Sequence, residues 1–141
     1  MIKEKEKTGA GQISASSEDY LKAVLLLHKK KGTVRCVDLA DFFGYAKPSI
    51  SHAVALLEEG GYLRRETSGN LVLTEAGKKI AELTYEKHCF FRTQLMNAGV
   101  EEKLADREAC QMEHTISEAS FEKLKVSTER RDIYGKEQNK S

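Results

Sequence analysis

The feature that most constrains the fold is a pair of short helical segments with a three-residue connection between them. The first spans residues 37–44, where Gly44 favours the end of a helix. In the second, Pro48 favours a first helical position, and apolar residues recur at helical spacing from Ile50 to Leu57 before a Gly-Gly pair. Two short helices joined in this way form a helix-turn-helix. We expect the first segment to bury one apolar face, made of Leu39, Ala40, Phe42 and Phe43.

A further helix is predicted before this motif. Ser16 or Ser17 can cap a helix that reaches about Lys31 and stops at Gly32. Residues 1–15 contain little to bury, and we expect them to form a flexible tail.

A hairpin is predicted after the motif. Residues 62–66 and 70–73 have the pattern of two strands around a polar turn that contains Gly69. Three helices followed by such a hairpin predict a winged helix-turn-helix domain over residues 16–76.

The second half predicts longer helices. Thr74 can cap a helix over residues 75–97, and residues 101–115 predict another. A last helix over residues 117–125 is expected to end there, because the charged sequence beyond it lacks an apolar stripe. The fold class is therefore mainly α, with an all-helical second domain over residues 77–141.

Composition agrees with a globular helical protein. Charged residues make up 32% of the chain, and the 10 glycines and one proline fit neither a disordered chain nor a turn-rich β-sandwich. No apolar run approaches the roughly 18 residues that span a bilayer, and the start lacks a signal peptide. We expect a cytoplasmic protein without a membrane partner. Three cysteines are too few and too scattered for a disulfide framework.

The predicted helix-turn-helix has the basic charge and the polar side chains of a DNA-binding motif. Residues 20–80 contain ten basic and six acidic side chains. Short polar side chains at the start of the second helix can approach base edges in a major groove, while cations on the hairpin can contact phosphates. A protein-interaction module, with the arginines as a solvated surface pair, is the alternative. The candidate DNA-binding residues are Lys47, Pro48, Ser49, Ser51, His52, Arg64 and Arg65.

A second candidate site lies near the end of the chain. On a helix, Cys110, Glu113 and His114 would share one face, because positions i, i+3 and i+4 are neighbours. Thiolate, carboxylate and imidazole groups are metal ligands, although a partly buried polar face is the alternative for this triplet. Two further residues, His88 and Asp19, support a metal site. The alternative is that His88 is a core histidine whose hydrogen bonds are satisfied and that Asp19 only caps a helix.

Seven motifs, in their order and spacing over about residues 16–126, resemble the diphtheria toxin repressor family of iron- and manganese-dependent regulators. The resemblance implies a winged-helix DNA-binding domain followed by a helical metal-binding and dimerisation domain. The motifs are Asp19-Tyr20-Leu21, Asp38-Leu39-Ala40, Pro48-Ser49-Ile50-Ser51, Gly61-Tyr62-Leu63, Leu73-Thr74-Glu75-Ala76-Gly77, His88, and Cys110 through Ser117.

The resemblance implies a metal-ligand set that mixes two branches of the family. Cys110, Glu113 and His114 match ligands of the iron branch. Asp19 matches a first-helix ligand that is methionine in the iron branch and aspartate in the manganese branch. His88 matches a histidine that both branches use in a neighbouring site.

Three departures from the family pattern concern that neighbouring site. Lys22 replaces a second carboxylate of the manganese branch, Arg92 an ancillary glutamate of the iron branch, and Asp106 an ancillary histidine. The two cations would repel a second metal ion, or replace its charge through a salt bridge. We therefore expect one full metal site. The sequence ends soon after the last helix, so we also expect no third, SH3-like domain of the kind found in long iron-branch members.

These observations predict a metal-dependent transcriptional regulator and not an enzyme. We expect a homodimeric repressor of metal-uptake genes that binds a palindromic operator in double-stranded DNA. Fe²⁺ is the first candidate metal, because the Cys110 sulfur is a softer donor than carboxylate, and Mn²⁺ is the second, with Zn²⁺ and Co²⁺ as surrogates.

Two other functions are weighed against this one. A metal-independent winged-helix regulator could respond to an organic ligand or an oxidant. A hydrolase built on Cys110 and His114 would need a nearby oxyanion hole, and nothing glycine-rich around Cys110 suggests one.

Overall fold

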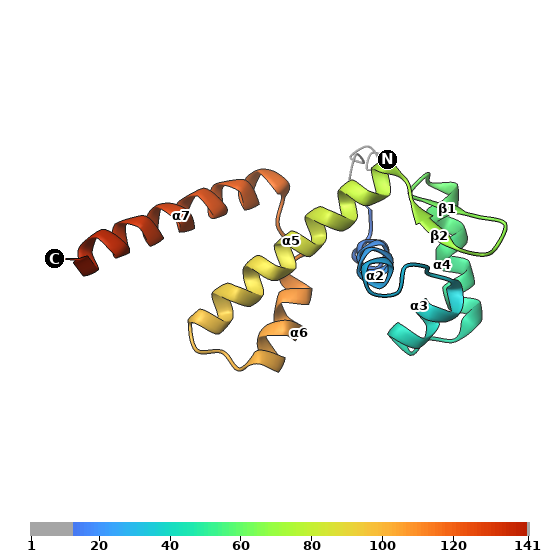
Figure 1. Cartoon of the computed structure of the whole chain (residues 1–141), viewed down its shortest axis with the longest axis horizontal. Coiled ribbons are helices and arrows are strands. Elements are labelled where there is room, and N and C mark those ends of the chain that lie inside the picture. Colours follow the sequence, from blue (N-terminus) through green and yellow to red (C-terminus); the bar gives the residue numbers. More distant parts are fainter. Residues whose placement is uncertain (1–12, 141) are drawn as a thin grey trace, which may run out of the picture. The chain divides into compact units, whose positions relative to one another are not determined.

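The computed structural model describes residues 13–140, with side chains through residue 131. Most of the predicted tail, residues 1–12, lies outside the described residues. The chain divides into two compact units, residues 1–86 and 87–141. Figure 1 labels the elements, which are α2 (Ala15–Lys31), α3 (Cys36–Phe43), α4 (Lys47–Glu59), β1 (Leu63–Arg65), β2 (Leu71–Leu73), α5 (Glu75–Asn97), α6 (Glu102–Met112) and α7 (Glu118–Lys140).

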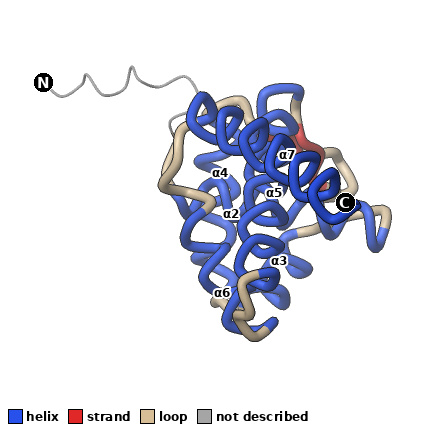
Figure 2. Tube along the Cα trace, turned by 90° about the vertical axis from the view of Figure 1, so that its left-hand side faces the viewer, coloured by secondary structure: helices blue, strands red, loops and turns tan. Residues whose placement is uncertain are grey.

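Helices dominate this architecture, which confirms the mainly α prediction. Figure 2 shows helix over most of the described chain and strand in one small region, where β1 and β2 lie. None of the described helices combines the length and the apolar character needed to cross a membrane.

The first helix starts earlier than its sequence suggested. Its N-cap is Ser14, whose side-chain oxygen accepts a hydrogen bond from the Ser17 backbone N–H at 3.0 Å. The expectation of Ser16 or Ser17 as the cap is therefore wrong. Ser14, Ser16 and Ser17 can each supply a capping oxygen, so composition alone does not fix the helix start. The end of α2 at Gly32, with φ +88°, is as expected.

The first unit is built on an apolar core that α2, α3, α4 and the hairpin share. Leu21, Val24, Leu39, Ile50 and Val54 are all completely buried in it. One predicted core residue is wrong, because Phe42 at the end of α3 is 53% exposed. Phe43 packs against the core and contacts the rings of Tyr20 and Tyr45, and successive helical side chains point about 100° apart, so Phe42 does not share its direction.

The predicted hairpin is confirmed as an antiparallel pair. Its register pairs Leu63 with Leu73 and Arg65 with Leu71. The Leu71 N–H also donates to the Val34 carbonyl at 2.7 Å, which ties the hairpin to the loop before α3.

Where the hairpin ends, α5 begins in very close contact with it. Thr74 caps the helix by accepting from the Gly77 N–H at 3.1 Å, and the Thr74 N–H donates to the Tyr62 carbonyl. A Cβ atom at Gly77 would lie 2.0 Å from that same Tyr62 oxygen. Only glycine fits this position without a shift of the backbone.

The second unit consists of the end of α5, α6 and α7. Phe121 of α7 is completely buried and packs edge-on against Phe90 of α5, with 5.4 Å between ring centroids. Helix α7 continues to Lys140, far beyond the end predicted near Lys125. The missing apolar stripe predicts poor packing but not the end of a helix, and the sequence from 127 to 140 contains no proline to break one.

Helix α6 ends sooner than predicted. It stops at Met112, so Glu113 is its C-cap and His114 lies in the following turn. The Thr115 hydroxyl donates to the Met112 carbonyl at 3.0 Å and satisfies one of the orphan carbonyls of the last turn. The assumption that Cys110, Glu113 and His114 all lie on one helix is thus wrong, and a turn brings their side chains together.

Candidate metal centre and nucleic-acid interface

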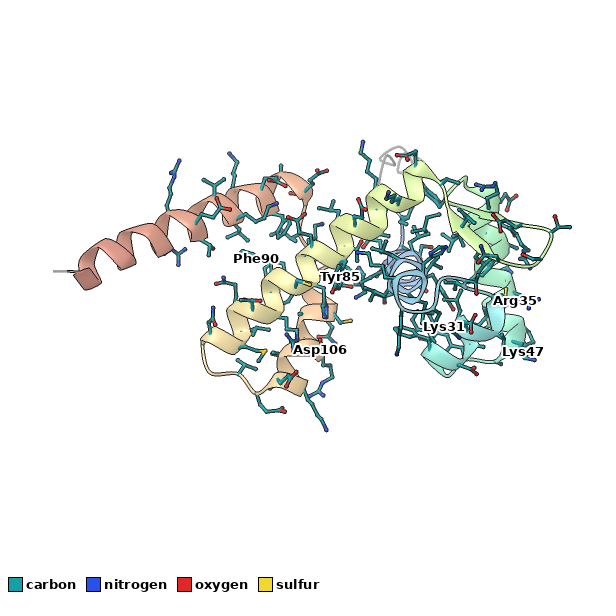
Figure 3. All side chains as sticks on the ribbon, in the orientation of Figure 1. Lys31, Arg35, Lys47, Tyr85, Phe90 and Asp106 are labelled. Atoms are coloured by element: carbon teal, nitrogen blue, oxygen red, sulfur yellow. The ribbon has the colours of Figure 1, made fainter. Side chains whose placement is uncertain are left out.

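The start of α4 presents polar side chains to solvent. Pro48 lies in the first helical turn, and Ile50 and Val54 are completely buried beneath the helix. The outward side of this turn carries only short or polar groups, and nothing in the described chain covers it. The exposed residues are Lys47 (Figure 3), Pro48, Ser49, Ser51 and His52.

The two arginines of the hairpin have different surroundings. Arg64 is exposed, and it has no ion pair with another described residue. Arg65 Nη2 instead lies 3.1 Å from Glu58 Oε1 on α4, and this hydrogen-bonded contact raises the pKa of the Arg65 guanidinium. Arg65 therefore holds the hairpin against α4, whereas Arg64 is available to a polyanion.

An acidic residue organises the start of α3. Asp38 Oδ2 accepts from the Arg35 backbone N–H at 2.8 Å, and its other oxygen accepts from the Lys31 ammonium. The hydrogen bond from Lys31 and then that from Arg35 hold the pKa of the Asp38 carboxyl below its ordinary value. The first helix of the helix-turn-helix is thus tied to the end of α2.

Glu113 is the centre of the second unit. Its side chain is completely buried, and its two oxygens have different imidazole neighbours. Oε1 lies 3.0 Å from His88 Nδ1 on α5, and Oε2 lies 3.2 Å from His114 Nε2. A buried carboxylate lowers the stability of the fold unless it is paired or coordinated. Each carboxylate oxygen of Glu113 has such a partner.

A sulfur donor completes a cluster around Glu113. Cys110, in the last turn of α6, is half-buried, and ligand atoms of His88, Cys110 and Glu113 all lie within 4.8 Å of one another. Nitrogen, sulfur and carboxylate oxygen at such separations can converge on one metal ion. The donor set in this unit therefore fits a transition metal, although α6 and its following turn supply it differently from the single helix that was expected.

Ion pairs occupy the neighbouring position, where no full second metal site was expected. Asp106 Oδ1 lies 3.0 Å from His88 Nε2 and 3.3 Å from Arg92 Nε, and Figure 3 shows Asp106 on α6 beside α5. Arg92 Nη2 lies 2.6 Å from Glu102 Oε2. The guanidinium thus pairs with two carboxylates at this place.

The two remaining residues of the predicted metal chemistry belong to the first unit. Asp19 lies near the start of α2 and is half-buried, and Lys22 lies one turn later and is 8% exposed. Both interact with other groups of the protein. Their relation to the metal cluster stays a prediction.

One buried polar contact of the second unit was missed from the sequence. Lys87, next to His88, is 8% exposed, and its ammonium donates to the Ile116 carbonyl at 2.8 Å. It fixes the turn that follows Glu113 and His114. A lysine at this place has no signal in the sequence, because helix periodicity does not identify the partner of a long cationic side chain.

Comparison with known proteins finds two family models that follow one another along the chain. Residues 12–71 match the family model for the N-terminal DNA-binding domain of iron-dependent repressors. Residues 74–133 match the model for their metal-binding and dimerisation domain.

Individual relatives are also regulators. An uncharacterized HTH-type transcriptional regulator of Methanocaldococcus jannaschii is 30% identical over 120 residues, which cover 84% of this chain and 96% of the relative. The HTH-type transcriptional regulator MntR of Bacillus subtilis is 30% identical over 109 residues, which cover 77% of each chain.

A solved structure extends the comparison to the fold. The structure of the manganese regulator SloR matches with a TM-score of 0.72 and 25% identity, over 80% of this chain and 53% of SloR. The chain therefore spans about half the length of that regulator. From the two family models and the relatives that align over most of their length, we conclude that this chain belongs to the iron-dependent repressor family of DNA-binding, metal-binding regulators.

Proposed function

We propose that this chain is a metal-dependent DNA-binding regulator whose second unit senses Fe²⁺ or Mn²⁺ and whose first unit reads a palindromic operator as a dimer. The observation that carries the proposal is the buried Glu113 carboxylate with nitrogen and sulfur donors around it. Glu113 is fully buried and has an imidazole nitrogen close to each of its carboxylate oxygens, a setting suited to a carboxylate that meets a cation. The regulatory role that we assign to this chain is repression of metal-uptake genes.

The ligands we propose are Glu113, His114 and Cys110 of the second unit, together with Asp19 of the first. Support for Asp19 comes from the family resemblance of its motif. His88 contacts Glu113 directly and either joins the ligand set or orients that carboxylate. When bound, the metal ion supplies positive charge that offsets the repulsion between carboxylates and any thiolate.

The donor set favours Fe²⁺ over Mn²⁺, because Cys110 adds a sulfur ligand to otherwise hard oxygen and imidazole donors. Mn²⁺ is our second candidate, and the manganese regulators among the similar proteins support it. Zn²⁺ and Co²⁺ should act as surrogates in solution.

Regulation follows from where the ligands belong in the chain. Asp19 is part of the unit that carries the exposed α4 surface, whereas Glu113 is part of the metal-binding and dimerisation domain. Ligands shared in this way restrict the orientations that the DNA-binding unit samples. In a dimer, two α4 helices held about 34 Å apart can then enter successive major grooves of one operator.

The test is selection of binding sites from a pool of random DNA duplexes, performed anaerobically with Fe²⁺, Mn²⁺, Zn²⁺ or EDTA. We expect palindromic sequences to be enriched only with metal, and the affinity for them to rise about 5–150-fold on metal addition. Equal enrichment in EDTA would contradict metal control and support a metal-independent regulator.

Two variants separate the parts of the proposal. Asp19→Ala should still bind metal through Glu113 and its neighbours, but metal should no longer tighten DNA binding. His52→Ala should retain the metal response and lose discrimination between the selected site and random DNA, since one base contact accounts for about 1–3 kcal/mol. If the Asp19 variant kept the full metal response, Asp19 would serve only the start of α2.

A further inference from the structure

Four charged or polar side chains form a ladder between α5 and α6. His88 and Arg92 lie one helical turn apart on α5, and Glu102 and Asp106 lie one turn apart on α6. The contacts run from Glu102 to Arg92 at 2.6 Å, from Arg92 to Asp106 at 3.3 Å, and from Asp106 to His88 at 3.0 Å. The last step, from His88 to Glu113 at 3.0 Å, connects the ladder to the metal cluster.

The ladder contains groups of the metal-donor type that already have a cation. Arg92 contacts the Glu102 and Asp106 carboxylates, Asp106 also contacts the His88 imidazole, and such oxygen and nitrogen groups bind divalent cations of the Mn²⁺ type. Arg92 is the permanent cation among them, because a guanidinium stays protonated in proteins. Its guanidinium presents separate nitrogens, Nη2 to Glu102 and Nε to Asp106, which is the forked geometry that arginine provides.

We propose that Arg92 is a tethered cation that occupies the Glu102 and Asp106 carboxylates in place of a second metal ion and, through Asp106, holds His88 against Glu113. Arg92 and Asp106 are then positioning residues of the regulatory metal site, so this inference deepens the proposed function and rests on it. It also gives a physical reason for the single full metal site that the sequence leads us to expect.

The orientation of His88 is the physical link between the ladder and the ligands. Both of its ring nitrogens face carboxylate oxygens, Nδ1 toward Glu113 and Nε2 toward Asp106, so the ring cannot rotate without losing a contact. Outer partners of this kind fix the orientation of the group beside a metal ligand, and their loss typically weakens metal binding about 10–100-fold.

The deciding experiment counts Mn²⁺ equivalents by equilibrium dialysis and by the EPR signal of free Mn²⁺, on the full chain. We expect Arg92→Gln to bind one equivalent more than the wild type, because removal of the guanidinium leaves Glu102, Asp106 and His88 open to a cation. The matched control is Arg107→Gln, which removes an exposed arginine of α6 and should leave the count unchanged. The double variant Arg92→Gln/Asp106→Asn should return to the wild-type count.

A second readout reports on positioning. In the metal-free protein, Asp106→Asn should shift the ¹⁵N resonances of the His88 ring, and with Mn²⁺ it should weaken the first equivalent about 10-fold. Arg107→Gln should change neither. Circular dichroism checks the fold of each variant, and if Arg92→Gln fails to fold, the Asp106→Asn result decides alone.

Failure of this inference differs from failure of the proposed function. An equal count in the wild type and a folded Arg92→Gln variant overturns the role of Arg92, even if the wild type binds one equivalent and responds to metal. A wild type that binds no metal overturns the proposed function. An unchanged His88 ring and first-equivalent affinity in Asp106→Asn overturn the positioning role.

Discussion

The two units of this chain have interiors of opposite character. The first is organised by aliphatic side chains, with residues such as Leu39 and Ile50 completely excluded from solvent. The second has Phe121 and two small alanines in its interior, but beside them lies an equally buried carboxylate, Glu113. An apolar core contributes to stability whether or not a cation is bound, whereas the contribution of a buried charge depends on the groups next to it.

This difference between the interiors matches the difference in function between the two units. The unit that reads DNA needs one rigid shape, and the burial of Ile50 under α4 provides it without a cofactor. The unit that senses metal needs an interior whose energy changes when a cation arrives, and a buried carboxylate with imidazole partners has that property.

The largest effect is expected from a break in the apolar interior. Ile50→Ala should lower the free energy of unfolding by about 2–5 kcal/mol, because it removes buried methyl groups under α4 and leaves a cavity. Denaturation in urea measures the loss. Because the interior of the first unit is apolar, added Mn²⁺ should not restore its stability. DNA binding should be lost with and without metal.

The polar interior should show the opposite behaviour. Mn²⁺ at about 100 times its dissociation constant should stabilise the wild type by about 2.7 kcal/mol, since it binds the folded chain only. In Glu113→Gln, which keeps the size of the side chain and removes its charge, this gain should disappear from the thermal melting curve. A Glu113→Gln protein that metal stabilises as strongly as the wild type would place the site elsewhere.

A smaller test concerns a polar contact that serves the apolar unit. Asp38→Ala should cost about 1 kcal/mol, because the Arg35 N–H at the start of α3 loses its acceptor. The pKa of Asp38 is lowered in the folded protein, so its contribution is present above the pKa of the unfolded carboxyl. It is lost as the pH falls through the lower folded pKa. The stability difference between wild type and variant, followed by denaturation against pH, should shrink on acidification.

The smallest effect is expected on the hairpin surface. Arg64→Ala should weaken binding to selected and random DNA alike and reduce the salt slope by about one. Arg65→Ala should change the slope less, because Glu58 already neutralises that guanidinium. Fluorescence anisotropy over a range of salt concentrations compares them, and equal slopes for the two variants would show that the Glu58 pair opens on DNA.

The difference between the two units also explains which parts of the structure could be predicted from the sequence. Periodic apolar residues predicted α4 and the hairpin correctly, and the capping preference of threonine predicted the Thr74 cap, because each of these signals is local in the sequence. The end of α6 was predicted three residues too late. Helix periodicity does not reveal the hydrogen bond from the Thr115 hydroxyl to the Met112 carbonyl that accompanies this end. The ladder through Arg92 and Asp106 depends on the alignment of two helices, and spacing along the chain suggested only that a salt bridge was one option.

The close approach of Gly77 to Tyr62 has a consequence for building chimeras of such regulators. The two family models meet between residues 71 and 74, which makes that short gap an attractive junction for exchanging one sensing domain for another. A cut there would separate Thr74 and Gly77 from the Tyr62 carbonyl that they fit against, and any incoming helix without glycine at this position would collide with the hairpin. The first turns of α5 therefore belong to the DNA-binding module as a unit of recombination. A graft should keep them and join the new domain further along the helix, near the end of the first compact unit at Glu86.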